Sequence, residues 1–366
     1  SEMCIRDRFK LLSELRPKIV IHTAANVDVD YSEEHQIEAN RINVEGTRNI
    51  VEASKAIGAK LVFISSDYVF DGKDGPYTEE DKATPINIYG KTKLQAEKVI
   101  VEQLKDYLII RPTLILGRES KFVLQLISAS KEGQSIKLPT DVYTNPIDVS
   151  SLARIIERLI SKNALGIYHV GGKEYLSRYE LGVKLVEAFN LSKGFIETCS
   201  FTELRKKAKR PLKGGLKIDK LIAQFPDEKE LHSELKLGQE QSVIKKISDN
   251  SNTTGSPVRQ DKTDNKVVVI GGGTGTKAVI EGYVKYNLIP KEKLPLIVLI
   301  PSTDNGGSTG IILEALFEKW SIFILPWSLS SLTTLLEIME IPKPASTACL
   351  IASLLPNSIA GSMVTL

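Results

Sequence analysis

Tyr89 and Lys93 are four positions apart and form a Tyr-x-x-x-Lys pattern. On a helix, residues at i and i+4 share a face, so both side chains would point at one ligand. The ammonium of Lys93 would favour the tyrosinate and lower the pKa of Tyr89, which would make it a proton donor to a carbonyl near neutral pH. The pattern occurs often by chance, and an exposed Tyr–Lys pair is the alternative interpretation.

A serine upstream favours the catalytic interpretation. Ser65 and Ser66 end the apolar run LVFISS, which predicts a buried strand. Ligands of open α/β sheets lie at the carboxyl ends of strands. There Ser66 would donate a hydrogen bond to the carbonyl oxygen that Tyr89 protonates. The alternative is that Ser66 only caps a helix or turn.

The sequence around these residues, ISSDYVFDG…GPYTEEDKATPINIYGKTKLQAEK, resembles the dTDP-4-dehydrorhamnose reductase family of extended short-chain dehydrogenases/reductases. That family carries Ser/Thr-Asp-Tyr-Val-Phe followed by Tyr-Gly-x-x-Lys. The resemblance continues through RPKIVIHTAANVDVD and INVEGT upstream, and through RPTLILG, NPIDVSSLA, GIYHVGG and KRPLKGGLKIDKL downstream. It therefore covers residues 9–225 in the right order.

This resemblance implies that Ser66, Tyr89 and Lys93 are the catalytic triad of a reductase. Tyr89 is then the general acid, and Lys93 tunes it and holds the nicotinamide ribose. Ser66 and Asp67 would contact the substrate, a 4-keto nucleotide sugar. The residues that would line the cofactor, NADPH or NADH, are Tyr89 and Lys93 together with Ala25, Asn26 and Val27.

Three other polar residues have less distinctive patterns. His22 and His169 lie within apolar strands and are predicted to be packed strand residues, since Tyr89 already fills the acid role. Asn43 lies in a predicted helix and is either structural or on the cofactor side. The residue pattern alone does not separate these two interpretations.

Alternating strands and helices must position the site. Apolar β-branched runs predict strands, and longer polar-faced stretches predict helices, one of them with Ser177 as its N-cap. This repetition predicts an α/β fold with a Rossmann-like, doubly wound parallel sheet, and a small substrate lobe formed mainly by residues 118–225. The predicted strands are 18–24, 61–66, 107–111 and 166–170, and the predicted helices are 33–56, 87–104, 122–131, 149–161 and 177–189.

The family begins with a strand and a glycine-rich turn whose backbone N–H groups meet the pyrophosphate. Residues 1–11 hold no counterpart, and residues 1–8 are expected to be an artefact. The sequence therefore predicts an incomplete sheet and poor binding of NAD(P)H. Other members of the family are non-catalytic regulatory subunits of methionine adenosyltransferase, and this is the alternative function.

A second unit follows a predicted linker at 226–265, which has mixed charges and almost no aromatic residues. Residues 266–366 are expected to form a partial α/β nucleotide-binding unit, in which strands at 267–270 and 296–301 pair in a separate small parallel sheet. A glycine-rich loop follows each strand, and such loops suit phosphate. The expected anion site comprises Gly272, Gly273, Gly275, Asp304, Gly306 and Gly307.

This unit resembles a fragment of the 2-phospho-lactate transferase/gluconeogenesis-factor family over residues 266–310. It gives a third candidate function, a transferase-like nucleotide binder.

Composition narrows the class of protein. Of 366 residues, 42% are hydrophobic and 25% charged, as in an ordinary globular protein, and the net charge is +3. This near balance gives no reason to expect nucleic acid or an anionic membrane as partner. The three cysteines, Cys4, Cys199 and Cys349, fit a cytoplasmic protein without a disulfide framework or a metal site. A homodimer is left open.

Overall fold

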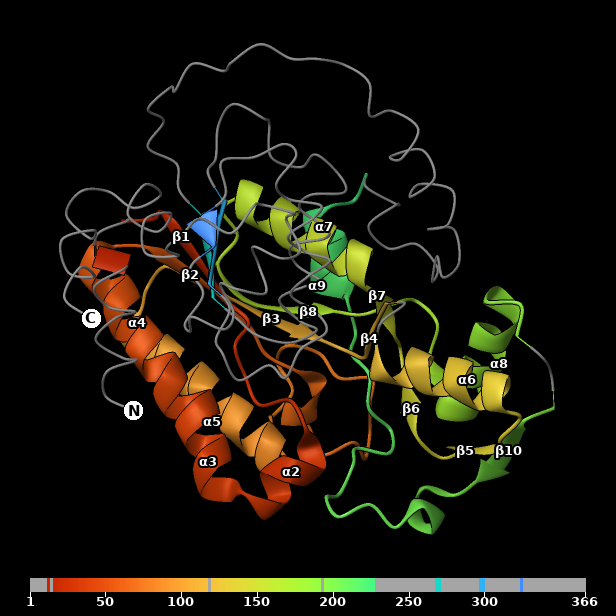
Figure 1. The fold of residues 1–366 in the computed structure, drawn as a ribbon. Coiled ribbons are helices and arrows are strands. Elements are labelled where there is room, and N and C mark those ends of the chain that lie inside the picture. Colours follow the sequence, from red (N-terminus) through yellow and green to blue (C-terminus); the bar gives the residue numbers. More distant parts are fainter. Residues whose placement is uncertain are drawn as a thin grey trace, which may run out of the picture.

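The computed structural model describes residues 12–13, 16–117, 120–191 and 194–227, and strand residues 267–270, 296–299 and 323–324. At its centre is a seven-stranded parallel sheet of order β13-β12-β11-β1-β2-β3-β8 (Figure 1). The strands are β1 (Ile19–His22), β2 (Lys60–Ile64), β3 (Tyr107–Pro112), β8 (Gly166–Val170), β11 (Val267–Ile270), β12 (Leu296–Leu299) and β13 (Phe323–Ile324). The predicted parallel α/β sheet is confirmed.

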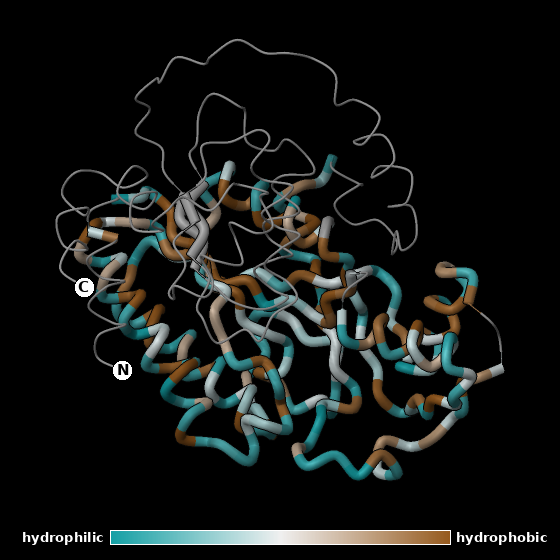
Figure 2. The backbone as a smooth tube through the Cα atoms, viewed as in Figure 1, coloured by the Kyte–Doolittle hydropathy of each residue, from teal (hydrophilic) through white to brown (hydrophobic). Residues whose placement is uncertain are grey.

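Helices cover both faces of this sheet because its strands carry apolar side chains on both sides. Val20 and Phe63 pack on one face against α4 (Gly46–Ile57) and α5 (Ile88–Gln103). On the other face, strand residues such as Ile21 and Val62 pack against α7 (Val149–Ser161) and α9 (Asp219–Gln224). In Figure 2, hydrophobic and hydrophilic residues alternate along α4, as a helix with one buried face requires.

The long helix predicted at 33–56 is divided in the structure. It consists of α3 (Gln36–Asn40), a π-helical turn (Arg41–Glu45) and α4, and it is preceded by α2 (Val29–Glu34). The polar periodicity gave no signal for the π-turn, which inserts buried Asn43 toward the site. The other four predicted helices agree closely with the structure, whereas α2 and α9 (Asp219–Gln224) were not predicted.

The second lobe contains α6 (Lys121–Glu132) and α8 (Arg178–Ala188). Ser177 caps α8 in a capping box with Glu180, as predicted. The lobe has its own core around Leu126, Leu138 and Leu185. Its strands form three two-stranded sheets: β5 (Ile136–Pro139) with β10 (Ile196–Cys199), β4 (Ile115–Leu116) with β7 (Ile147–Asp148), and β6 (Tyr143–Thr144) with β9 (Leu176–Ser177).

The expectation that the second unit forms a separate sheet is wrong. β11 and β12 are parallel neighbours, as predicted, but β11 also pairs with β1 in register, Ile19 opposite Val267 and His22 opposite Ile270. The physical reason is that a buried β1 paired only with β2 would leave a row of N–H and C=O groups without partners. The strands of the second unit therefore extend the first sheet.

Candidate active site

Ser66 and Tyr89 meet beyond the carboxyl end of β2. The chain leaves β2 at Ile64, and the Ser66 hydroxyl accepts a hydrogen bond from the Tyr68 amide at 3.2 Å. Tyr89 is the second residue of α5, whose N-cap Asn87 accepts from the Gly90 amide at 2.8 Å. The side chains of Ser66 and Tyr89 lie close enough to interact, and both residues are buried.

Lys93 reaches the same strand end one helical turn later. Its Nζ donates to the Ile64 carbonyl at 2.6 Å and lies 4.2 Å from the centre of the Phe63 ring. Burial lowers the pKa of Lys93 to about 7, and the nearby Glu97 carboxylate opposes that shift. Lys93 therefore changes charge near neutral pH, which an exposed lysine does not do.

The pKa of Tyr89 does not follow the expected direction. Burial raises it, the neighbouring Asp67 and Tyr68 add to that rise, and only the interaction with Ser66 opposes it. Lys93 is not among the groups that shift this pKa, and its Nζ donates to the Ile64 carbonyl instead. The expected lowering of the Tyr89 pKa by Lys93 is thus wrong for this structure, in which Tyr89 is a protonated phenol.

Asp67 lies beside this pair and is only partly exposed. Ser66 donates to its carboxylate at 3.3 Å. Burial raises the pKa of Asp67 to about 6, although Ser66 and the positive charge of Arg178 oppose the shift. Arg178 is the first residue of α8, so the second lobe brings a positive charge near Asp67. No local pattern points to Arg178, because 111 positions separate it from Asp67 and only the fold brings them together.

The residues after β1 are held by Asn43. The Asn26 amide donates to Asn43 Oδ1 at 2.7 Å, and Asn43 Nδ2 donates to the Asn26 carbonyl at 3.1 Å and to the Thr92 hydroxyl at 2.9 Å. Asn43 therefore has a structural role, because it ties the loop after β1 to α5. Ala25 is partly exposed and Val27 is 61% exposed, so this loop presents its surface at the carboxyl end of the sheet.

The two histidines are packed strand residues, as predicted. His22 is 2% exposed and its Nε2 contacts the Thr47 hydroxyl at 3.0 Å. His169 is fully buried, and burial, together with the Arg111 charge, lowers its pKa to about 3.

The anion site expected in the second unit cannot be placed: all six of its residues lie outside the described residues. Within the described part of the chain, no group of three or more His, Cys, Asp or Glu could hold a metal ion. No helix in that part has the length and apolar character needed to span a bilayer.

The comparison with protein families decides the classification. The model of the RmlD substrate binding domain matches residues 7–237. The chain belongs to this family. The match contains all three residues proposed for catalysis, and the strand, serine and helix described above lie within it.

Two kinds of curated relative are similar to this chain. Methionine adenosyltransferase 2 subunit beta of Rattus norvegicus is 33% identical over 195 residues, which are 50% of this chain and 57% of the relative. The spore coat polysaccharide biosynthesis protein SpsK of Bacillus subtilis is 34% identical over 198 residues, which are 54% and 69%. The chain thus spans little more than half the length of the adenosyltransferase subunits.

Solved structures agree with the family. A dTDP-4-dehydrorhamnose reductase from Clostridium acetobutylicum is 30% identical, with a TM-score of 0.60 over 65% of this chain and 84% of its own. The same enzyme from Bacillus anthracis, solved in complex with NADP, is 31% identical, with a TM-score of 0.59 over 67% and 85%. The fold of this family member is therefore that of the nucleotide-sugar reductases.

Proposed function

We propose that this protein reduces a 4-keto nucleotide sugar with NADPH or NADH. The observation that carries the proposal is the convergence of buried Ser66 and Tyr89 beyond the carboxyl end of β2, with Lys93 one turn farther along the same helix. Ser66 would orient the substrate carbonyl and Tyr89 would give its proton to the carbonyl oxygen. A Tyr89 that stays protonated is suited to that role.

The described residues fit the nicotinamide half of a dinucleotide. The strand order reverses between β1 and β11, since later strands run outward from each, and α/β sheets bind ligands beyond the carboxyl ends of strands at such a point. Ala25, Asn26 and Val27 follow β1 there, and Lys93 Nζ lies at the neighbouring strand end. When bound, the nicotinamide supplies the hydride.

The substrate would enter from the second lobe. Asp67 lies there beside Ser66, within reach of the positive charge of Arg178. An arginine suits a diphosphate because its guanidinium pairs with phosphate oxygens. We therefore assign Ser66 and Asp67 to the sugar.

The test measures turnover and binding separately, with the full chain. Consumption of NADPH with dTDP-4-dehydrorhamnose is followed by absorbance, and NADPH binding by nicotinamide fluorescence. Tyr89→Phe keeps the ring but removes the proton donor, and should lower kcat by about 100-fold or more. Tyr107→Phe, at the amino end of β3, is the matched control and should keep wild-type turnover. Equal turnover of Tyr89→Phe and wild type would overturn the proposal.

A second candidate is a regulatory subunit without turnover, which the similarity to methionine adenosyltransferase 2 subunit beta favours. The same preparation distinguishes the two candidates. If the wild-type chain shows no reduction but forms a stable complex with a methionine adenosyltransferase catalytic subunit, the regulatory function replaces the reductase. Micromolar binding of NADPH would contradict the expected weak affinity without deciding between them.

A further inference from the structure

A buried ion pair lies directly behind the proposed site. Glu97 is one helical turn beyond Lys93 on α5 and is 2% exposed. Arg111 on β3 binds it with two hydrogen bonds, Nε to Oε1 at 3.0 Å and Nη2 to Oε2 at 2.6 Å. The Ser65 hydroxyl also donates to Glu97 Oε1. One carboxylate therefore touches the residue that precedes Ser66 and shares a helix face with Lys93.

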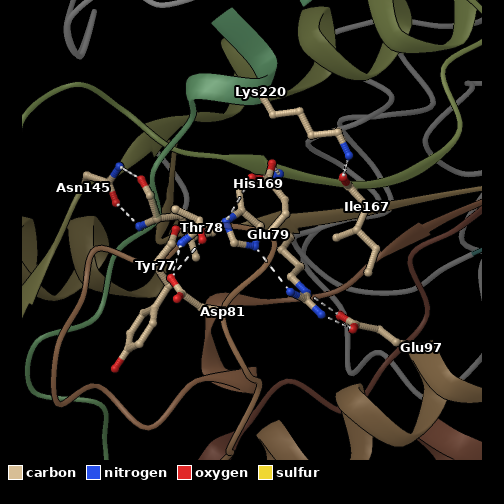
Figure 3. A network of polar contacts seen from close by, with 11 residues as sticks. Tyr77, Thr78, Glu79, Asp81, Glu97, Asn145, Ile167, His169 and Lys220 are labelled. Atoms are coloured by element: carbon tan, nitrogen blue, oxygen red, sulfur yellow. Dashed lines mark hydrogen bonds and ion pairs between the residues drawn. The ribbon is translucent and has the colours of Figure 1, made fainter. Parts of the chain in front are cut away.

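The pair continues along the same face of the sheet to the neighbouring strand β8 and the loop that contains Tyr77. Arg111 Nη1 lies 3.3 Å from His169 Nε2, and His169 Nδ1 lies 3.1 Å from the Tyr77 carbonyl. Since the low pKa keeps the imidazole neutral, its Nδ1–H donates to Tyr77 and its Nε2 accepts from Arg111. Figure 3 shows Glu97, His169 and Tyr77 in this network. Arg111 is thus fixed from both sides.

Burying an ion pair costs free energy, so it is an unfavourable way to hold two elements together. Two charges that are buried lose their hydration, and their mutual attraction offsets this loss only when their geometry is good. Apolar residues of the same volume often give a protein equal or greater stability. Here the Glu97 carboxylate bonds to Arg111 and Ser65, and the third nitrogen of the Arg111 guanidinium contacts His169. The position of the pair behind Lys93 therefore indicates a role in the site as well as in the fold.

We propose that Glu97, held by Arg111, is a positioning residue that keeps the Lys93 ammonium charged and aligned with Ser66 and Tyr89. This inference rests on the proposed function for its catalytic meaning. The groups that contact Lys93 are the Phe63 ring and the Ile64 carbonyl of β2. Glu97 of its own helix is the nearby charge that acts on it.

The expected effects of the two charges have opposite signs. Glu97→Gln removes the carboxylate and leaves Arg111 uncompensated, so Lys93 should lose its proton at a pH lower by about one unit. Arg111→Gln leaves the carboxylate uncompensated, so the midpoint should rise by a similar amount. A pair that only holds the helix in place would not move the midpoint in opposite directions.

The measurement is direct titration of the Lys93 side chain by nitrogen-15 NMR of the full chain, with the signal assigned by its loss in Lys93→Met. Lys60, another buried lysine, bound to Asn163 at 2.9 Å, is an internal reference and should give the same signal in every variant. No cofactor or turnover is needed. An inactive wild-type protein would therefore overturn the proposed function, whereas the titration of Lys93 would still test this inference.

Single variants of a buried pair can fail to fold, so the double variant Glu97→Gln/Arg111→Gln is part of the design. It buries no uncompensated charge, and without the nearer carboxylate its Lys93 midpoint should still lie below that of wild type. An unchanged midpoint in the double variant, or shifts of the same sign in both single variants, would overturn the inference. In an active preparation, the alkaline limb of the kcat profile should shift with the Lys93 midpoint.

Discussion

Asn145 binds the backbone of Leu216 with both ends of its side-chain amide, across 71 positions in the sequence. Its Oδ1 accepts from the Leu216 amide at 2.9 Å, and its Nδ2 donates to the Leu216 carbonyl at 2.9 Å and to the Gly172 carbonyl at 2.8 Å (Figure 3). The amide therefore joins three segments next to the candidate site.

Replacing this amide should be costly. Asn145→Ala leaves the Leu216 amide and carbonyl buried without partners, and should lower the free energy of unfolding by about 2–4 kcal/mol. Urea unfolding measures the change. Asn40→Ala is the matched control, because Asn40 makes one exposed hydrogen bond, to Gln95, and should cost less than about 0.5 kcal/mol. Similar losses in the two variants would contradict this account of Asn145.

Gly90 allows α5 to approach the loop after β2. A Cβ at Gly90 would lie 2.1 Å from the Tyr68 carbonyl oxygen and 3.0 Å from Pro85. Gly90→Ala must push the helix away, so it should cost about 1–3 kcal/mol and separate Tyr89 from Ser66.

Gly46→Ala is the control for that substitution. Gly46 is also helical, but its Cβ would meet only the Arg41 carbonyl oxygen, at 3.8 Å. Here alanine should stabilise the protein by about 0.5–1 kcal/mol. Thermal unfolding of both variants gives the comparison, and a stabilising Gly90→Ala would show that the close approach is not real.

His169 should make the protein sensitive to acid. Its folded-state pKa of about 3 lies below the ordinary value of 6.5, so the unfolded chain binds the proton more readily. The contribution of this group to stability is complete above pH 6.5 and is lost as the pH falls from 6.5 toward 3. His169→Gln removes the titrating group, and its melting temperature should fall less over this window.

The raised pKa of Asp67 has the opposite effect on stability, because the folded state binds the Asp67 proton more tightly than the unfolded chain does. The protein therefore loses the contribution of Asp67 to stability as the pH rises from 3.8 through about 6. Both proteins contain Asp67, so the difference between their melting curves reports on His169. Parallel curves for wild type and His169→Gln would rule out the neutral buried imidazole.

The pairing of β11 with β1 can be tested by hydrogen exchange. Val268 is opposite Val20, and β11 lies between two strands, so Val268→Pro removes a ladder donor from an interior strand. Amides of Ile19–His22 should then exchange faster. Thr254→Pro, in the predicted linker, is the control and should leave β1 protected. Unchanged exchange in β1 of Val268→Pro would mean that the two strands are not paired.

The sequence determined the elements whose signals are local. The helix Val149–Ser161 was predicted with its final bounds, and Ser177 as a cap, because apolar periodicity and capping act within a few residues. The i,i+4 spacing also placed Tyr89 and Lys93 on one helix. By contrast, the π-turn at Arg41–Glu45 escaped prediction because packing, and not propensity, selects it.

Only the tertiary structure decided the electrostatics and the long-range pairs. The spacing of Tyr89 and Lys93 predicted a lowered tyrosine pKa, but burial raises it, and the amount of burial depends on every element around the site. Arg111 meets Glu97 where β3 packs against α5, and the charge of Arg178 reaches Asp67 across 111 positions of sequence. Likewise, β11 joined the first sheet because β1 offered an open edge, which is a property of the assembled strands.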